Sequence, residues 1–365
     1  MTVIDPFNPK PNSKISLNLL GGGVTGAFFH FGVLAALDDH MSRKVTTFDI
    51  FMGSSAGSLV AAICAVGLSP QVSVEEIMTE KKGNFQMRRR DIYRFSFLDW
   101  AKEILKFWWT FFYLVYLRIE NPAEAPSFFW GLKDSLPSGV FSMRYYEAWI
   151  KSTFEKNNLP LFFSQIQKEL YIPAYDLDSN ERVIFGKPPF QHIPFSKAIA
   201  ASSTIPIFFE PTEIEGRYYM DGGLGEMAHL DISAAAGANL IILVNPMVPI
   251  RNDLDSVQIK TVFDAKGRIR DKGFTYVYDQ CLRNELRQKV HVGLRHMGYL
   301  YPGVDVLLIE PDEADPTMFL FNPMDFESRK QIVQFGYDMT QRKLKENAEL
   351  WKRTLDRHQI TLVGV

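Results

Sequence analysis

The chain has 365 residues, of which 46% are hydrophobic and 22% are charged, a composition typical of a folded globular protein rather than a disordered or fibrous one. Its 40 Lys and Arg residues against 42 Asp and Glu residues give a net charge of −2. Such a chain has no overall positive field, so we expect no nucleic acid partner.

The two cysteines, Cys64 and Cys281, exclude a disulfide framework and show no metal-ligand spacing. Residues 1–14 are polar and lack the apolar region of a secretory signal, so we expect a flexible N-terminal segment and a cytoplasmic location. The longest uncharged aromatic run, Phe107 to Leu117, is shorter than the roughly 18 apolar residues of a membrane-spanning helix.

The first part of the chain contains two successive strand, turn and helix units. Residues 14–20 alternate like a strand, three glycines follow, and residues 25–37 show helical spacing. Residues 48–52 then predict a second strand, and residues 58–66 a second helix after a turn of small residues. Two such units close together indicate a parallel α/β sheet.

A basic run and an aromatic helix follow, and we interpret residues of about 80–130 as an insertion. The basic residues are Lys81, Lys82, Arg88, Arg89, Arg90 and Arg94. The segment from Phe95 to Ile119 is compatible with a helix. Because Trp and Tyr favour the boundary between water and lipid, Trp108, Trp109, Phe111 and Phe112 predict a lid or interfacial helix on an anionic membrane or lipid droplet. The alternatives are an ordinary buried helix and a solvated basic face.

The remainder of the chain continues the α/β pattern and ends in helices. Strands are predicted at residues 170–175, 182–185, 216–220, 240–245 and 304–310, and helices at 196–203, 232–236, 253–297 and 326–355. The predicted organisation is therefore a flexible segment (1–14), a catalytic α/β domain (15–245) and a mainly helical C-terminal extension (246–365) packed on the same domain.

The sequence Gly53-Ser54-Ser55-Ala56-Gly57 fits the pattern Gly-x-Ser-x-Gly. The glycines of this pattern permit a sharp turn that exposes the central serine at a helix N-terminus, where an alkoxide or oxyanion is favoured. Ser55 is therefore the candidate nucleophile, and a purely structural turn of small residues is the alternative. Gly21, Gly22 and Gly23 offer backbone N–H groups for an oxyanion hole; a phosphate-binding loop is disfavoured because its Gly-Lys-Ser/Thr ending is missing.

A serine nucleophile needs a base, and Asp221 is the candidate. It opens the sequence Asp221-Gly222-Gly223 after a strand-like segment, although Asp-Gly is also a common hairpin turn. His229 offers an alternative triad, since serine, acid and histidine would follow the chain order of the α/β hydrolases. That alternative is disfavoured because those enzymes place several strands before the nucleophile, whereas here Ser55 lies only about thirty residues after the first glycine turn. His30, among phenylalanines on the first helix, is predicted to be structural.

These three motifs, in this order, resemble the patatin-like phospholipase family over roughly residues 15–245, and the sequences of residues 201–206 and 237–242 are also similar to that family. The resemblance implies a three-layer α/β fold with a mostly parallel central sheet flanked by helices. It implies a Ser-Asp dyad of Ser55 and Asp221 without histidine, with Gly21, Gly22 and Gly23 as the oxyanion hole. The implied reaction is the hydrolysis of lipid acyl esters through an acyl-enzyme, as in phospholipases A, lysophospholipases or acylglycerol lipases, with no metal or cofactor.

The sequence departs from the family pattern at two places. Thr25 stands where the family usually has Arg or Lys, and Glu226-Met-Ala-His-Leu230 stands where an Asn-Pro element is common. The missing positive charge favours a neutral acylglycerol over a phosphate headgroup. The expected partners are a lipid substrate and a peripheral membrane or lipid-droplet surface; a lipid acyltransferase or transacylase and a catalytically silent lipid-binding protein are the alternative functions.

Overall fold

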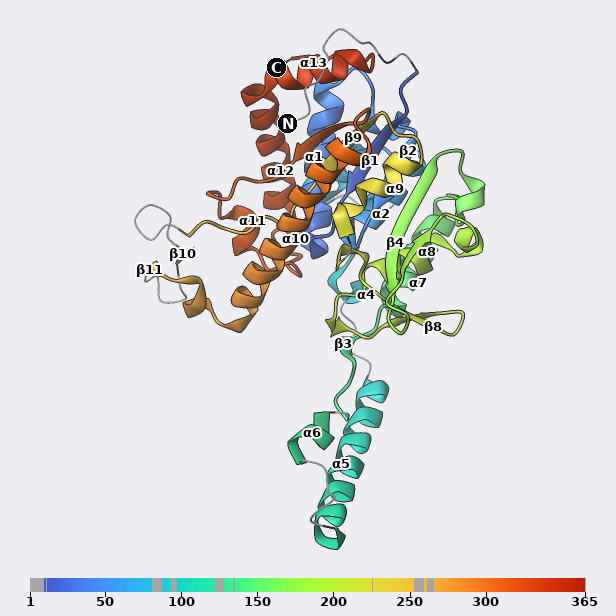
Figure 1. Cartoon of the computed structure of the whole chain (residues 1–365), viewed down its shortest axis with the longest axis vertical. Helices are drawn as coiled ribbons and strands as arrows, with labels where there is room; N and C mark the ends of the chain where they lie inside the picture. Colours follow the sequence, from blue (N-terminus) through green and yellow to red (C-terminus); the bar gives the residue numbers. More distant parts are fainter. Residues whose placement is uncertain are drawn as a thin grey trace.

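A computed structural model of the chain describes residues 10, 12–80, 87–92, 97–121, 128–133, 135–224, 226–252, 259–260 and 266–364. These residues form an α/β body from which a helical arm projects (Figure 1). Most of the predicted flexible segment 1–14 lies outside the described residues, as do Lys81, Lys82 and Arg94 of the basic run.

The centre of the body is a mixed sheet that is mostly parallel, which confirms the predicted fold class. Its strand order is β12-β9-β1-β2-β4-β8-β7, with β5 also paired to β4. The first five strands run parallel, and β5, β7 and β8 are antiparallel to their neighbours. The strands are β1 (Ile15–Leu19), β2 (Ile50–Gly53), β4 (Glu169–Asp176), β5 (Arg182–Phe185), β7 (Thr212–Ile214), β8 (Arg217–Met220), β9 (Leu240–Val244) and β12 (Asp305–Ile309).

Helices cover both faces of this sheet (Figure 1). Strand β9 is apolar at every position because alternate residues face different layers. Leu240, Ile242 and Val244 belong to one core with α1 and α12, whereas Ile241 and Leu243 belong to a second core with α9 and α10. The central strands are thus buried on both sides, as in other parallel sheets.

Helices α1 (Gly23–His40) and α2 (Ala56–Ala65) directly follow β1 and β2. Helix α12 lies against α1, and the contact is close enough that a Cβ added at Gly32 would come within 2.1 Å of the Val333 carbonyl oxygen. The remaining helices of the body are α3 (Pro70–Thr79), α4 (Arg89–Ile92), α7 (Arg144–Lys156), α8 (Phe195–Ser202), α9 (Leu230–Ala235), α10 (Phe274–Leu300), α11 (Thr317–Leu320), α12 (Arg329–Glu346) and α13 (Ala348–Arg357).

Two predicted helices differ from those observed. Of the helix expected over residues 253–297, residues 253–258 and 261–265 lie outside the described residues, and residues 259–260 and 266–267 form short strands. Helix α10 begins at Phe274, where Gly273 adopts a positive φ (91°) that ends the preceding turn. The single helix expected over residues 326–355 is two helices, separated at Asn347 by a non-helical residue (φ −119°, ψ 27°). Helical periodicity does not detect a break of one residue.

Short strand pairs were not predicted at all. Strand β3 (Gly139–Phe141) pairs in parallel with β6 (Ile207–Phe209), and β10 (Ile259–Lys260) pairs with β11 (Lys266–Gly267). Runs of two or three residues are too short to show the alternation by which strands are recognised in a sequence.

The aromatic segment forms the arm, made of α5 (Phe97–Glu120) and α6 (Phe128–Lys133), which points away from the body (Figure 1). Leu114 is buried where α5 meets α6, beside Gly131. Among the described residues no single helix is long and apolar enough to cross a membrane; α2 and α3 reach that length and composition only when taken together, with a bend of 120° between them.

Candidate active site

The two glycine-containing turns meet at one edge of the sheet. Strands β1 and β2 are parallel neighbours in which Leu19 pairs with Gly53, so the turns that follow them start side by side. The Ser54 N–H donates to the Leu19 carbonyl (3.0 Å). A Cβ added at Gly21 would lie 2.9 Å from the Ser55 Cβ, so only glycine permits this approach of the first turn to the serine.

Ser55 lies on a sharp turn at the start of α2. Its backbone has a positive φ (51°) with ψ at −130°, a conformation that is rare for a residue with a side chain. The turn packs so closely on β1 that a Cβ at Gly57 would come within 2.2 Å of the Leu19 carbonyl oxygen. The geometry is that of a nucleophile elbow, which presents a serine hydroxyl at a helix N-terminus.

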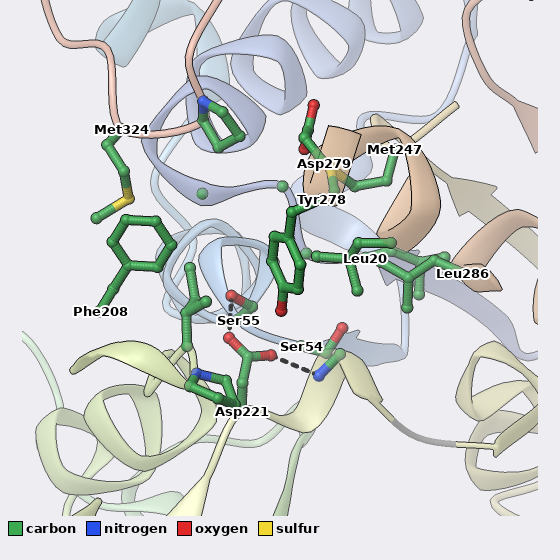
Figure 2. Close-up of a pocket in the computed structure, with 18 of the residues that line it drawn as sticks. Leu20, Ser54, Ser55, Phe208, Asp221, Met247, Tyr278, Asp279, Leu286 and Met324 are labelled. Carbon is green, nitrogen blue, oxygen red and sulfur yellow. Dashed lines mark hydrogen bonds between the residues drawn. The ribbon is translucent and has the colours of Figure 1, made fainter. Parts of the chain in front are cut away.

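Asp221 comes from the end of β8 and meets Ser55 directly. The Ser55 Oγ donates to Asp221 Oδ2 (2.7 Å), as Figure 2 shows. The Gly223 N–H donates to Asp221 Oδ1 (2.6 Å). The Asp221 N–H in turn donates to the Thr204 carbonyl (3.0 Å). Both carboxylate oxygens are therefore held, and one of them faces the serine proton.

Burial controls the chemistry of this carboxylate. Asp221 is 5% exposed, and loss of solvent raises its pKa to about 6, while the hydrogen bonds from Ser55 and the Gly223 N–H act in the opposite direction. A carboxylate with a pKa close to neutrality is ionised at pH 7 and is a stronger base than an ordinary aspartate. The pair can thus transfer the serine proton to the aspartate.

The glycine turn offers backbone donors beside Ser55. The first N–H groups of an α-helix have no acceptor within the helix. In α1 the Thr25 N–H donates to the Pro323 carbonyl (3.3 Å), whereas no described residue accepts a hydrogen bond from the N–H groups of Gly22 or Gly23. These donors are available to an oxyanion formed at Ser55.

Thr25 cannot supply the positive charge of the basic residue that is usual at this position, and its side chain is fully buried. Its hydroxyl donates to the Gly22 carbonyl (3.2 Å). The residue therefore fixes the glycine turn from inside, and it brings no charge to the site.

The two histidines considered from the sequence are both buried and hydrogen-bonded to backbone carbonyls. His229 Nε2 donates to the Gly222 carbonyl (2.6 Å), and His30 Nε2 donates to the Leu20 carbonyl (2.7 Å). Burial lowers the pKa of each to about 4. Both rings are therefore neutral at pH 7, and each binds a backbone carbonyl of the site, whereas the Ser55 hydroxyl donates its hydrogen bond to Asp221.

Ser202, at the end of α8, is a site residue that the motifs did not single out. Its Oγ accepts a hydrogen bond from the Ser55 N–H (3.0 Å) and donates to the Pro173 carbonyl on β4 (2.6 Å). It lies in the run of residues 201–206, which was noticed only for its resemblance to the family. Nothing in the sequence distinguished Ser202 from Ser203, because the hydrogen bond to the Ser55 N–H depends on which serine lies close to Ser55 in the fold.

A cavity of about 400 Å³ opens in front of the pair, within the range of ligand cavities in proteins. Much of its wall comes from α10 and from residues 319–324, among them Tyr278, Leu286 and Met324 (Figure 2). The fully buried Arg283 ties these two segments together, since it donates to Asp279 Oδ2 (2.7 Å) and to the Met318 carbonyl (3.0 Å). The last third of the chain therefore completes the site, which the sequence did not reveal.

Charge is scarce in this cavity. Among the described residues that line it, Lys289 is the only Lys or Arg, and the acids are Asp221 and Asp279. No group of three His, Cys, Asp or Glu side chains within the described part of the chain could hold a metal ion. The surroundings of Ser55 are thus mainly apolar.

The aromatic candidates of the arm lie away from this site. Trp108, Trp109 and Phe112 are exposed on α5, and Phe111 is partly buried in ring contacts with Trp108 and Phe112. No residue of α5 is among the described residues that line the cavity. The arm does not form a lid over Ser55 in this arrangement.

A sequence profile described as patatin-like phospholipase matches residues 19–233, which is more than half of the chain. Similar solved structures include VipD from Legionella pneumophila, with 14% identity, a TM-score of 0.38 and coverage of 93% of this chain and 68% of that protein. The type III effector ExoU gives 13% identity, a TM-score of 0.36 and coverage of 93% and 54%. The complex of ExoU from Pseudomonas aeruginosa with SpcU gives 15% identity, a TM-score of 0.30 and coverage of 79% and 53%.

The role of Ser202 can be tested by stability. We expect Ser202→Ala to lower the free energy of unfolding by about 1 to 3 kcal/mol, because it leaves the Ser55 N–H and the Pro173 carbonyl buried without a partner. The matched control is Ser203→Ala, since the Ser203 hydroxyl has no hydrogen-bond partner among the described residues. Denaturation in urea measures both; equal stability of the two variants would contradict the assignment.

Proposed function

Because the chain belongs to the patatin-like phospholipase family, as its motifs predicted, we propose that it hydrolyses lipid acyl esters with Ser55 as the nucleophile and Asp221 as the base. The family assignment implies lipid acyl hydrolase activity. The observation that supports the dyad is the direct hydrogen bond of 2.7 Å between the Ser55 Oγ and the buried Asp221 carboxylate.

In the proposed reaction, Asp221 accepts the Ser55 proton while the Oγ attacks the ester carbonyl carbon. The N–H groups of the Gly21–Gly23 turn stabilise the resulting oxyanion. Collapse of the tetrahedral intermediate expels the alcohol, which takes the proton from Asp221. Water then attacks the acyl-enzyme, gives a proton to the same carboxylate, and releases the fatty acid as Ser55 recovers its proton.

The apolar cavity favours the acyl part of a lipid over its headgroup. Lys289 is the one Lys or Arg side chain among the described lining residues, and Thr25 adds no charge beside the oxyanion. A neutral acylglycerol therefore fits inside the cavity, and an anionic headgroup would have to lie outside it.

We further propose that the arm docks on a lipid surface. Trp109 is 76% exposed and Phe112 64% exposed, and Leu105 and Ile119 lie exposed along the same side of α5. Aromatic residues with an apolar body and a polar tip favour the boundary between water and lipid. Lys102 and Lys106 on the same helix are suited to anionic headgroups. Such docking would make the protein a peripheral membrane protein in the cytoplasm.

The dyad predicts that Ser55→Ala and Asp221→Asn each lower kcat/KM for ester hydrolysis by at least about 1,000-fold. The exposed residues Ser179 and Asp178 provide matched controls, and Ser179→Ala and Asp178→Asn should retain full activity. His229→Gln, which keeps a donor for the Gly222 carbonyl, should retain most of the activity. Hydrolysis of p-nitrophenyl butyrate measures all five variants.

A triad would instead make His229→Gln as inactive as Ser55→Ala. A wild-type protein whose Ser55 does not react with a fluorophosphonate probe would favour the lipid-binding alternative. Product analysis with an added alcohol would separate a transacylase from a hydrolase.

If the arm docks on lipid, we expect the double variant Trp108→Ser and Trp109→Ser to lose binding to vesicles. The variant removes two large side chains that would insert among the lipid headgroups. Tyr299→Ser, at an equally exposed aromatic residue on α10, is the control and should bind as the wild type does. Sedimentation with vesicles of phosphatidylcholine, alone and mixed with phosphatidylglycerol, measures the binding. Unchanged sedimentation of the folded double variant would refute this role.

A further inference from the structure

Two further hollows adjoin the active-site cavity, as the lining residues that they share show. The first, here called the neck, has a volume of about 40 Å³ and shares Gly23, Ser55 and Met324 with the active-site cavity. The second, the far cavity, has a volume of about 370 Å³ and shares Ala27, Leu59 and Met87 with the neck. The three hollows therefore follow one another, with Ser55 at the first junction.

The neck is suited to a hydrocarbon chain. Apart from Ser55, Ser203 and the Tyr146 hydroxyl, its described lining is apolar and includes Met87, Met143 and Met324. Methionine side chains are unbranched and flexible, so a space bordered by three of them can widen for a chain. The Ser203 hydroxyl, which has no partner among the described residues, is available to the polar ester at the Ser55 end.

The position of Asp221 gives the bound ester a direction. Asp221 lines the active-site cavity but is not among the residues that line the neck. The leaving alcohol must lie near Asp221, because that carboxyl group returns the proton to it. The acyl carbon chain, which leaves the same carbonyl carbon in another direction, is then directed toward the neck.

The far cavity has an apolar interior and a charged rim. Its wall includes Phe28, Phe31, Ile63, Ile77 and Trp149. The charged residues that border it are Glu76, Glu80, Arg88, Arg89, Glu327 and Arg329, and Arg329 contacts Glu80 at 3.1 Å. The apolar part of the wall can receive the distal carbons of a chain.

We propose that the acyl chain being cleaved runs from Ser55 through the neck into the far cavity, while the glycerol side of the lipid stays in the active-site cavity. This proposal rests on the proposed function and adds a chain-length specificity to it. Short acyl chains end within the neck. Long chains gain apolar contacts in the far cavity, so the neck makes the enzyme selective for long-chain esters.

The test uses Met87→Trp, which places a large ring between the neck and the far cavity. We expect kcat/KM for p-nitrophenyl palmitate to fall at least about tenfold, which is the scale of discrimination by an apolar pocket. The value for p-nitrophenyl butyrate should fall much less, because a short chain does not extend past Met87 into the far cavity. Met78→Trp is the matched control, because Met78 is exposed on α3 and lines none of the three hollows. It should leave both esters unaffected.

Leu286→Trp narrows the active-site cavity instead and should preserve the ratio between the two esters. If Leu286→Trp removes palmitate hydrolysis selectively and Met87→Trp does not, the chain occupies the active-site cavity and the proposal is wrong. Equal loss of both esters in Met87→Trp would also overturn it, because the effect would then not depend on chain length.

A second measurement does not depend on hydrolysis. Palmitic acid with a diazirine at its terminal carbon is photocrosslinked to Ser55→Ala, and the labelled peptides are mapped. Labelling of α1 and α7, which carry Phe28 and Trp149, supports the proposal, and labelling of α10 at Leu282 or Leu286 overturns it. If the wild type hydrolyses no ester, the proposed function fails, while this labelling still decides the path of the chain.

Discussion

The chemistry proposed for this protein depends on one buried hydrogen bond, from the Ser55 Oγ to the Asp221 carboxylate. An aspartate in water is a weak base, and it becomes a useful one here because burial raises its pKa to about 6. The same burial would make an unpaired carboxylate costly, and the N–H of Gly223 together with the Ser55 hydroxyl offsets that cost. The site therefore combines a strengthened base with the partners that keep it folded.

The sheet provides this geometry. Parallel strands β1 and β2 end at the same edge, so the glycine turn and the serine turn are neighbours, and β8 brings Asp221 to the same place from the antiparallel side. Buried side chains then form hydrogen bonds with the backbone of each turn. Ser202 accepts from the Ser55 N–H, and Thr25 donates to the Gly22 carbonyl. His229 donates to the Gly222 carbonyl, and His30 donates to the Leu20 carbonyl. The two histidines are neutral and act as donors to these carbonyls, which is consistent with the proposed assignment of Asp221 rather than a histidine as the base.

The sequence predicted those parts of the structure that depend on local pattern. Strand-to-helix turns with glycines predicted the parallel sheet, which is confirmed, and singled out Ser55 and Gly21–Gly23, because such turns need a backbone that only small residues allow. It did not reveal Ser202, Met324 or the wall formed by α10, because these residues reach the site through tertiary packing across more than a hundred residues of chain. The break at Asn347 was missed for the opposite reason: it changes one residue and leaves the helical periodicity on both sides intact.

The most direct test of the account is the pH dependence of kcat/KM for a short ester. If Asp221 is the base, it must be ionised, so kcat/KM should be constant at higher pH and fall tenfold per pH unit below a single bend near pH 6, the value to which burial raises the pKa of Asp221. A bend near pH 4 would contradict the account, because either Asp221 would then titrate like an ordinary aspartate or His229, whose pKa burial lowers to about 4, would be the base.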